Sequence, residues 1–150
     1  MTSDNVSKIR SFYEVFARRD DAAVMAYFDP HVEWTSAENF IYADESPYAG
    51  LDAVRNLIFV RLQNDWDDFS LSAQEITGGD EVVIASGRFR GIFKANGAAV
   101  NAQFVQVFQF RDGKIAKCQT YTDTAQFKEA LARAPGSGAA EKQTALALGT

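Results

Sequence analysis

Three long segments of alternating apolar and polar residues follow one another between residues 81 and 121. Asn96-Gly97 and Asp112-Gly113 separate them, and these pairs favour tight turns because both residue types accept the left-handed backbone that such turns need. Neighbouring segments are therefore expected to pair antiparallel. Strands of this length form a twisted and curved sheet, which predicts a sheet closing around the preceding segments and a pocket for a small molecule. The predicted strands cover residues 82–93, 100–110 and 115–122.

Apolar residues recur at helical spacing at the start of the chain, which predicts helices there. An apolar stripe at helical spacing predicts a helix over residues 4–18. The stripe consists of Val6, Ile9, Tyr13 and Phe16. A second helix, capped by Asp20 or Asp21, is predicted to run through Phe28 and to stop at Asp29-Pro30, because proline cannot continue the backbone ladder.

Short strands, a long loop and two more helices complete the predicted α+β fold. Val32 and Trp34 alternate with polar neighbours, which predicts a strand whose apolar face meets the same core. Residues 36–50 form a loop of a length usually kept for function, and it is expected to cover the mouth of the pocket. The remaining elements are a helix near 54–62, a strand from residue 69 to the Gly78-Gly79-Asp80 turn, and a helix over 124–133 capped by Asp123. The helix near 54–62 is predicted from an apolar stripe of Val54, Leu57, Ile58 and Leu62.

Composition limits the classes of function. With 47% hydrophobic residues, the 150-residue chain can form one compact domain, predicted over 1–134, with a tail over 135–150. A net charge of −5 with scattered basic residues predicts no nucleic-acid partner. The lack of a long apolar run predicts a cytoplasmic protein with no membrane partner. A single Cys118 and a single His31 predict neither a disulfide nor a metal site.

Two glycines suggest that one face of the predicted sheet is unusually open. Gly87 and Gly91 lie two residues either side of Phe89 on one strand face, where missing side chains leave room for sheet curvature or for a ligand. Arg88 and Arg90 lie on the opposite face, which is expected to be the outer face and to contribute to a dimer contact.

Several short motifs accompany this order of elements. They are Phe12-Tyr13, Asp20-Asp21, Phe28-Asp29-Pro30 before Val32-Glu33-Trp34, Tyr48-Ala49-Gly50, and Phe110-Arg111-Asp112-Gly113-Lys114-Ile115 before Tyr121-Thr122-Asp123. Together they resemble the family of SnoaL-like polyketide cyclases and ketosteroid isomerases, over roughly residues 5–130. The resemblance implies an NTF2-like (cystatin-like) cone, in which a curved, mixed or antiparallel sheet wraps around N-terminal helices. It also implies a homodimer formed through the outer face of the sheet.

The same resemblance indicates candidate catalytic residues. Ketosteroid isomerases use a carboxylate base on the first strand and two donors to the oxyanion. Tyr13 occupies the position of the family's tyrosine, whereas Trp34 stands where the base is expected and Gln106 where the second donor is expected. A tyrosine hydroxyl and a glutamine amide can still donate to a developing oxyanion. Glu38 in the long loop is the candidate to replace the base, since a carboxylate desolvated beneath aromatic residues suits proton transfer.

Each candidate also has a purely structural interpretation. Tyr13 can be a core aromatic with a satisfied hydroxyl, Glu38 a solvated loop acid, and Gln106 a structural clamp. Aromatic residues can pack the core rather than line a pocket, and strand propensity explains threonine equally well. The predicted substrate contacts are Trp34, Tyr42, Phe89, Phe104, Phe108, Thr120 and Thr122.

These features favour a small hydrophobic or ring-bearing molecule as the ligand. One function is that of a cofactor-free isomerase, cyclase or lyase that acts by proton transfer on a hydrophobic carbonyl compound. An alternative is a non-catalytic homodimer that binds or senses a hydrophobic ligand, because fold alone does not establish chemistry. Epoxide hydrolysis by an acid and a base uses the same residue types.

Overall fold

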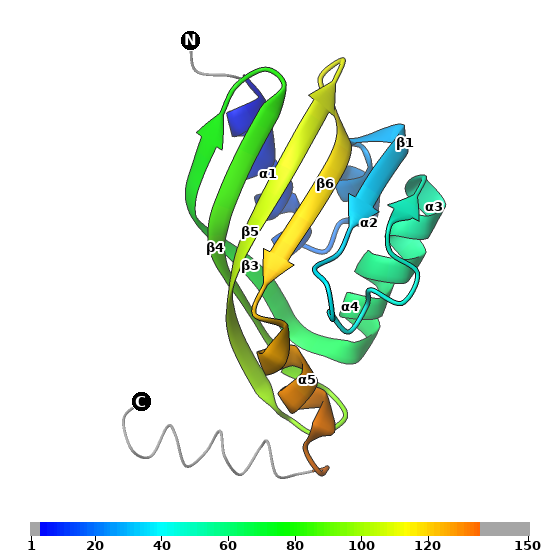
Figure 1. Cartoon of the computed structure of the whole chain (residues 1–150), viewed down its shortest axis with the longest axis vertical. Coiled ribbons are helices and arrows are strands. Elements are labelled where there is room, and N and C mark those ends of the chain that lie inside the picture. The colour runs from blue at the N-terminus through cyan, green and yellow to red at the C-terminus, as the bar shows by residue number, and fades with distance from the viewer. Residues whose placement is uncertain (1–3, 136–150) are drawn as a thin grey trace.

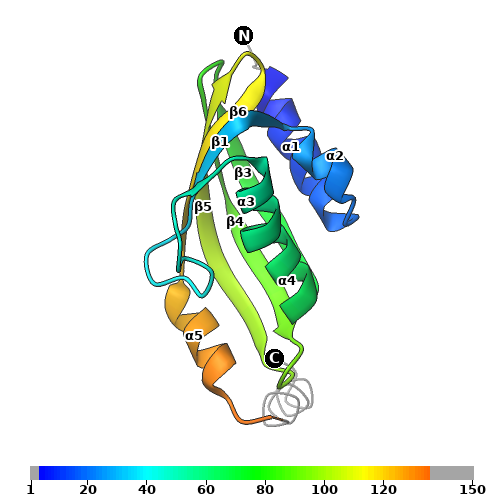
Figure 2. The same ribbon diagram turned by 90° about the vertical axis from the view of Figure 1, so that its right-hand side faces the viewer.

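The computed structural model describes residues 4–135 and has one six-stranded mixed sheet with the order β2-β1-β6-β5-β4-β3. Figure 1 shows the strands side by side, and Figure 2 shows helices α1 to α4 on one side of the sheet, with α5 at one end. The buried apolar side chains form one cluster between the helices and the sheet. This arrangement confirms the predicted α+β architecture.

The N-terminal helices differ from the prediction at one boundary. Helix α1 (Asp4–Ala17) buries the predicted stripe, and the Asp20 carboxylate caps α2 (Asp21–Met25) by accepting from the Ala23 amide at 3.1 Å. The prediction that α2 continues through Phe28 is wrong, because β1 (Phe28–Thr35) starts there. Phe28 pairs in parallel with Ile115, so the backbone groups of this segment find sheet partners instead of helical ones.

The predicted meander is confirmed. It consists of β3 (Trp66–Gly78), β4 (Val82–Phe93), β5 (Ala99–Arg111) and β6 (Lys114–Thr122). Each strand pairs antiparallel with the next. The short strand β2 (Tyr48–Ala49) pairs with β1, and helix α5 (Thr124–Ala132) follows the sheet with Asp123 at its N-cap position.

The third predicted helix contains an irregular turn that affects the cavity. Helix α3 (Leu51–Val54) continues into the π-helical segment η1 (Arg55–Phe59) and then into α4 (Val60–Asp65). A π-turn adds one residue to the helical repeat and changes which side chains face inward. Ile58 and its neighbour Phe59 are both buried as a result, whereas the predicted stripe residue Leu57 is only half-buried.

The glycines of β4 permit close packing. A Cβ atom at Gly91 would lie 2.9 Å from a Phe69 ring carbon, and one at Gly87 would lie 1.9 Å from the Ser72 carbonyl oxygen. The space left by the missing side chains is therefore taken by a ring and by the neighbouring strand. Of the two interpretations of these glycines, room for a ligand is therefore not supported, and sheet curvature stays a prediction.

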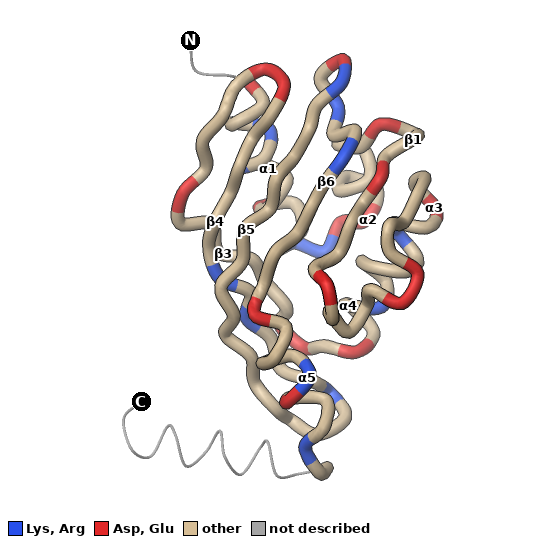
Figure 3. Tube along the Cα trace, viewed as in Figure 1, with Lys and Arg blue, Asp and Glu red and all other residues tan. Residues whose placement is uncertain are grey.

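Charged residues are scattered over the fold, many of them at turns (Figure 3). Within residues 4–135, none of the helices is both long and apolar enough to cross a membrane. The predicted tail, apart from Pro135, lies outside the residues that the structure describes.

Candidate functional site

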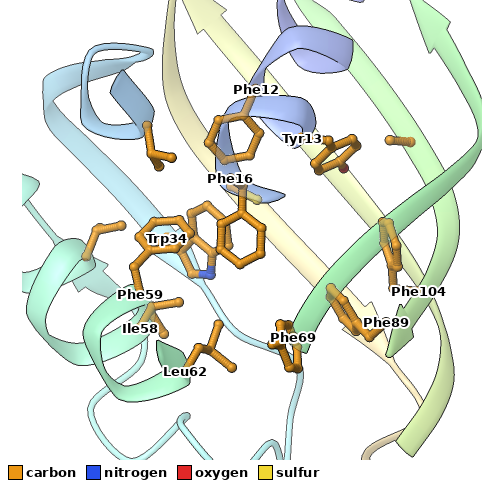
Figure 4. Close-up of a cluster of buried hydrophobic side chains, with 14 of the residues drawn as sticks. Phe12, Tyr13, Phe16, Trp34, Ile58, Phe59, Leu62, Phe69, Phe89 and Phe104 are labelled. Atoms are coloured by element: carbon orange, nitrogen blue, oxygen red, sulfur yellow. The ribbon is translucent and has the colours of Figure 1, made fainter. Parts of the chain in front are cut away.

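An apolar cavity lies between the sheet and the helices. Figure 4 shows several of the aromatic side chains that line it, among them Phe16, Trp34 and Phe59. Helix α1 contributes Phe12 and Phe16, and the π-turn contributes Ile58 and Phe59. The volume open to the centre of a water-sized sphere is about 40 Å³, enough for only a few water molecules. The apolar lining consists of Phe12, Phe16, Trp34, Phe40, Ile58, Phe59, Leu62, Phe69, Leu71 and Phe89, and the polar lining of Ser36, Gln106 and Thr120.

A line of hydrogen bonds connects α1 to this cavity. The Tyr13 hydroxyl donates to Gln106 Oε1 at 2.7 Å, and Gln106 Nε2 donates to Thr120 Oγ1 at 3.1 Å. Gln106 and Thr120 are directly opposite each other on β5 and β6, so the sheet register brings them together. All three side chains are at least 94% buried and every one has a partner. The line therefore satisfies polar groups that would otherwise destabilise the apolar interior.

The Gln106 amide has capacity left for a ligand. Its nitrogen carries two hydrogens, and Thr120 accepts one of them. Both partners of the amide are hydroxyls, which can donate or accept, so a reversed amide would keep both hydrogen bonds. At the cavity wall, the pair formed by Gln106 and Thr120 can thus serve either a carbonyl or a hydroxyl group.

The polar groups beside the cavity are electrically neutral. Burial raises the pKa of Tyr13 above its usual range, and the nearby Cys118 raises it further. Burial likewise raises the pKa of the Cys118 thiol. Both groups hold their protons at neutral pH. The described residues that line the cavity include no acid, histidine, lysine or arginine.

The structure brings four of the predicted site residues to the cavity wall. Trp34, Phe89, Gln106 and Thr120 line it directly, and Tyr13 reaches it through Gln106.

Four predicted substrate contacts do not line the cavity, and three of them lie in the core or on the outer face of the sheet. Phe104 stacks on Phe89 with ring centroids 4.4 Å apart, and Phe108 packs edge-on against Phe12, so both lie in the core behind the cavity wall. Thr122 donates to the Gln103 carbonyl at 2.7 Å and lines a groove on the outer face of the sheet.

Tyr42 anchors the loop rather than lining the cavity. Its hydroxyl donates to Asp65 Oδ2 at 2.6 Å and accepts from Trp66 Nε1 at 3.1 Å, while the Arg61 guanidinium lies 4.6 Å from its ring centroid. Burial, followed by the hydrogen bond to Asp65, raises the pKa of Tyr42. The Tyr48 hydroxyl donates to the Tyr42 carbonyl at 2.7 Å. These contacts hold residues 36–47, here called the strap, against α4 and β3.

The strap directs other side chains towards the cavity than the one predicted. Ser36 and Phe40 line the cavity, whereas Glu38 is exposed and does not. In this conformation the Glu38 carboxylate is solvated, and its assignment as a base stays a prediction.

Sequence reasoning missed most of the apolar lining. The helical stripes identified Phe16, Ile58 and Leu62 as buried, but periodicity cannot separate residues that line a cavity from those that fill the core. Phe59 lacked even that signal, because its inward position depends on the π-turn. Within residues 4–135, no cluster of three or more His, Cys, Asp or Glu side chains is placed to hold a metal ion.

The bent sheet with helices across one face defines an NTF2-like fold. Among solved structures, an NTF2-like protein from Burkholderia thailandensis matches with a TM-score of 0.80 and 26% identity, over 89% of this chain and 100% of its own. An NTF2-like protein of unknown function from Burkholderia pseudomallei matches with a TM-score of 0.78 and 27% identity, over 88% of this chain and 100% of its own. TerC, co-crystallised with polyporic acid, matches with a TM-score of 0.75 and 21% identity, over 87% and 100%.

Within that fold, the chain belongs to the SnoaL-like domain family, whose model matches residues 9–118. The match begins within α1 and covers most of the sheet, and therefore includes Tyr13 and Gln106. Comparison with curated proteins finds no match.

The buried Tyr13 hydroxyl should make the unfolding free energy depend on pH in the alkaline range. An unfolded tyrosine has a pKa of about 10, and the folded value is raised. The contribution of Tyr13 is therefore complete below about pH 10 and is lost as the pH rises towards the folded pKa, by at most about 1.4 kcal/mol per pH unit. We expect the difference in unfolding free energy between the wild type and Tyr13→Phe to shrink between about pH 10 and 12. Urea unfolding at fixed pH measures this difference, and parallel pH profiles would contradict the expectation.

Proposed function

We propose that the cavity binds a small, uncharged, ring-bearing molecule that presents a carbonyl or hydroxyl group to Gln106 and Thr120. The observation that carries this proposal is the combination of an aromatic cavity with a neutral amide and hydroxyl, with no ionisable side chain among its described lining residues. A charged ligand would lose its hydration there without gaining a counter-charge, which costs several kcal/mol.

The energetics favour a ring with one polar substituent. Apolar burial contributes about 25 cal/mol per Å² of ligand surface removed from water. A hydrogen bond to the amide adds about 0.5–1.5 kcal/mol, and it also fixes the orientation of the ring. The co-crystal of TerC with polyporic acid supports a small-molecule role for a protein of this fold.

A matched panel of small ligands tests the polar contact. We expect acetophenone and 1-phenylethanol to bind the wild type about fivefold more tightly than ethylbenzene, since each can form one additional hydrogen bond. Gln106→Leu should remove this preference and leave ethylbenzene binding in place. Isothermal titration calorimetry measures the affinities, and Trp34 in the cavity wall provides a fluorescence signal.

Gln109→Leu is the control, because it makes the same change on the same strand at an exposed position. It should retain the preference. A preference that survives in folded Gln106→Leu would overturn the assignment of the polar contact.

Proton transfer is the second candidate function, favoured by the donors at the cavity wall. An amide and a hydroxyl aimed at a carbonyl oxygen can stabilise an enolate in a dry site. The reaction also needs a base, and Glu38 would have to move inward with the strap to act as one. Epoxide hydrolysis needs both an acid and a base, and the cavity lining supports it least. Neither reaction requires a cofactor.

Deuterium uptake distinguishes binding from proton transfer. We expect acetophenone, incubated with the protein in heavy water, to gain no deuterium above a heat-denatured control, because no carboxylate lines the cavity in the described part of the chain. Mass spectrometry measures the uptake. Uptake that is lost in both Glu38→Gln and Tyr13→Phe would establish proton transfer and replace the binding proposal.

We also propose a homodimer formed through the outer face of the sheet. Val82, Ile84 and Tyr121 are large apolar residues that are 39%, 41% and 55% exposed. The sheet register places them close together, because Ile84 pairs with Val107 and Val105 pairs with Tyr121. Burying such a patch against a second copy removes apolar surface from water.

Substitution on this face tests the dimer. We expect Ile84→Glu and Tyr121→Glu to convert the dimer into a monomer, because each places a charge in the centre of the proposed interface. Sedimentation velocity measures the mass in solution. Leu131→Glu, at an exposed position on α5, is the control and should leave the dimer intact. A monomeric wild type would rule the interface out.

A further inference from the structure

A second hollow lies on the other side of Tyr13, between α1 and β3. Tyr13 and Ala17 of α1 face Leu71, Ala73 and Ile76 of β3 across it. The volume open to the centre of a water-sized sphere is about 270 Å³, much more than in the cavity. We call this hollow the α1–β3 groove.

The local sequence of β3 explains the shape of the groove. The register of β3 against β4 shifts between Ala73 and Glu75, as in a β-bulge with one extra residue in β3. Side chains on the two sides of the bulge change face by one position, so Ile76 lies on the same side as Leu71 and Ala73. The small side chains Ala17 and Ala73 leave the space that larger residues would fill. The walls are mainly apolar and the groove is open to solvent.

Leu71 separates this groove from the cavity. Its side chain lines both spaces, and it pairs across the sheet with Phe89, which lines the cavity. Tyr13 lines the groove, while its hydrogen-bond partner Gln106 lines the cavity. Leu71 is only half-buried, so a change of rotamer is open to it at modest cost. Such a change would join the two spaces beside the polar pair.

In the conformation of this structure, the cavity is too small for a ring, so ring binding requires a lining side chain to move. An engineered apolar cavity of about 150 Å³ binds benzene, whereas the cavity here measures about 40 Å³. A narrow cleft, distinct from the α1–β3 groove, adjoins the cavity at Phe16, Leu62 and Phe69, but its volume is only about 10 Å³. Opening the strap instead would break the hydrogen bonds of Tyr42 and Tyr48. Displacing Leu71 breaks no hydrogen bond of its side chain and reaches the larger space.

We propose that Leu71 is the gate of the binding site and that the α1–β3 groove is its second compartment. The ligand class is an uncharged ring carbonyl compound with an apolar chain. The ring occupies the cavity after Leu71 has moved aside and enlarged it, the carbonyl meets Gln106, and the chain extends past Leu71 into the groove. This proposal rests on the proposed function. Arg10 and Glu14 line the outer part of the groove with opposite charges, one helical turn apart, which favours an uncharged chain.

A series of alkyl phenones tests the second compartment. In the wild type, the dissociation constant should fall about fourfold for each methylene from acetophenone to butyrophenone to hexanophenone, which corresponds to about 0.8 kcal/mol per CH₂. Ala73→Phe fills the groove and should abolish this gain, while the dissociation constant of acetophenone changes less than about twofold. Thr77→Phe adds the same ring on the same strand at an exposed position outside the groove, and it should retain the full gain.

The result separates the two proposals. The second compartment would be overturned if acetophenone binds but a longer alkyl chain does not increase the affinity. It would also be overturned if the increase in affinity persists in Ala73→Phe. Either result would leave the proposed function intact. Absence of acetophenone binding, with or without the substitutions, would overturn both.

The rate of binding tests the gate itself. Leu71→Ala removes the partition, so acetophenone should associate about tenfold faster in stopped-flow measurements of tryptophan fluorescence, as a rotamer change is no longer needed. Leu57→Ala is the matched control, since it makes the same change at a half-buried position that lines neither space, and it should give no such acceleration. Acceleration by Leu62→Ala, at the narrow cleft, without acceleration by Leu71→Ala would place the passage between α1 and α4 and overturn the role of Leu71. If either variant fails to fold, the Ala73→Phe series still decides the proposal, because Ala73 is exposed.

Discussion

The buried amide of Gln106 is the constraint on which the site depends. An unpaired amide in an apolar interior destabilises a fold by about 1–3 kcal/mol, so its two partners must be in place. One partner, Tyr13, comes from α1, and the other, Thr120, comes from β6. Satisfying the amide therefore fixes the position of the first helix relative to the two central strands. The same hydrogen bonds set a neutral polar patch into a wall of aromatic rings, which connects the stability of the fold with the chemistry of its cavity.

The residues that form this line also show what a sequence can and cannot predict. Alternation and turn residues predicted the meander, and family resemblance placed Tyr13 and Gln106 together in a pocket. Both were candidates to donate to a ligand, with a core aromatic and a structural clamp as the alternatives, and the structure joins them through a hydrogen bond from the Tyr13 hydroxyl to Gln106. The partner of a buried polar group depends on distances between elements far apart in the chain, which local pattern does not contain. The π-turn at Arg55–Phe59 and the early end of α2 at Met25 escaped prediction for a related reason. In both places, tertiary contacts override local helical preference.

Neutrality distinguishes this cavity from a site built for proton transfer. General acid–base catalysis requires a group whose pKa lies near the working pH, and burial moves the pKa of Tyr13 and of Cys118 away from it. The position at which the family resemblance implies a carboxylate holds Trp34, which contributes an aromatic surface to the cavity. With Trp34 at this position, the described lining of the cavity lacks a carboxylate that could accept a proton and has an additional apolar surface. The proposed binding of a neutral ring rests on this difference, and proton transfer in the cavity would depend on a group brought from outside it.

The small size of the cavity adds a conformational step to any binding event. If the open arrangement of Leu71 is only a fraction of the population, the apparent dissociation constant rises by the inverse of that fraction. The strap has many polar contacts and resists opening, whereas Leu71 lies between two apolar spaces and is held by packing alone. The proposed gate therefore lies at the boundary between α1 and β3, where no side-chain hydrogen bond has to break. A ligand that fills both compartments stabilises the open arrangement through its own contacts, and a small ring without a chain does so less. Chain length would then determine how much of the population is open, and selectivity would arise from the gate as well as from the polar pair.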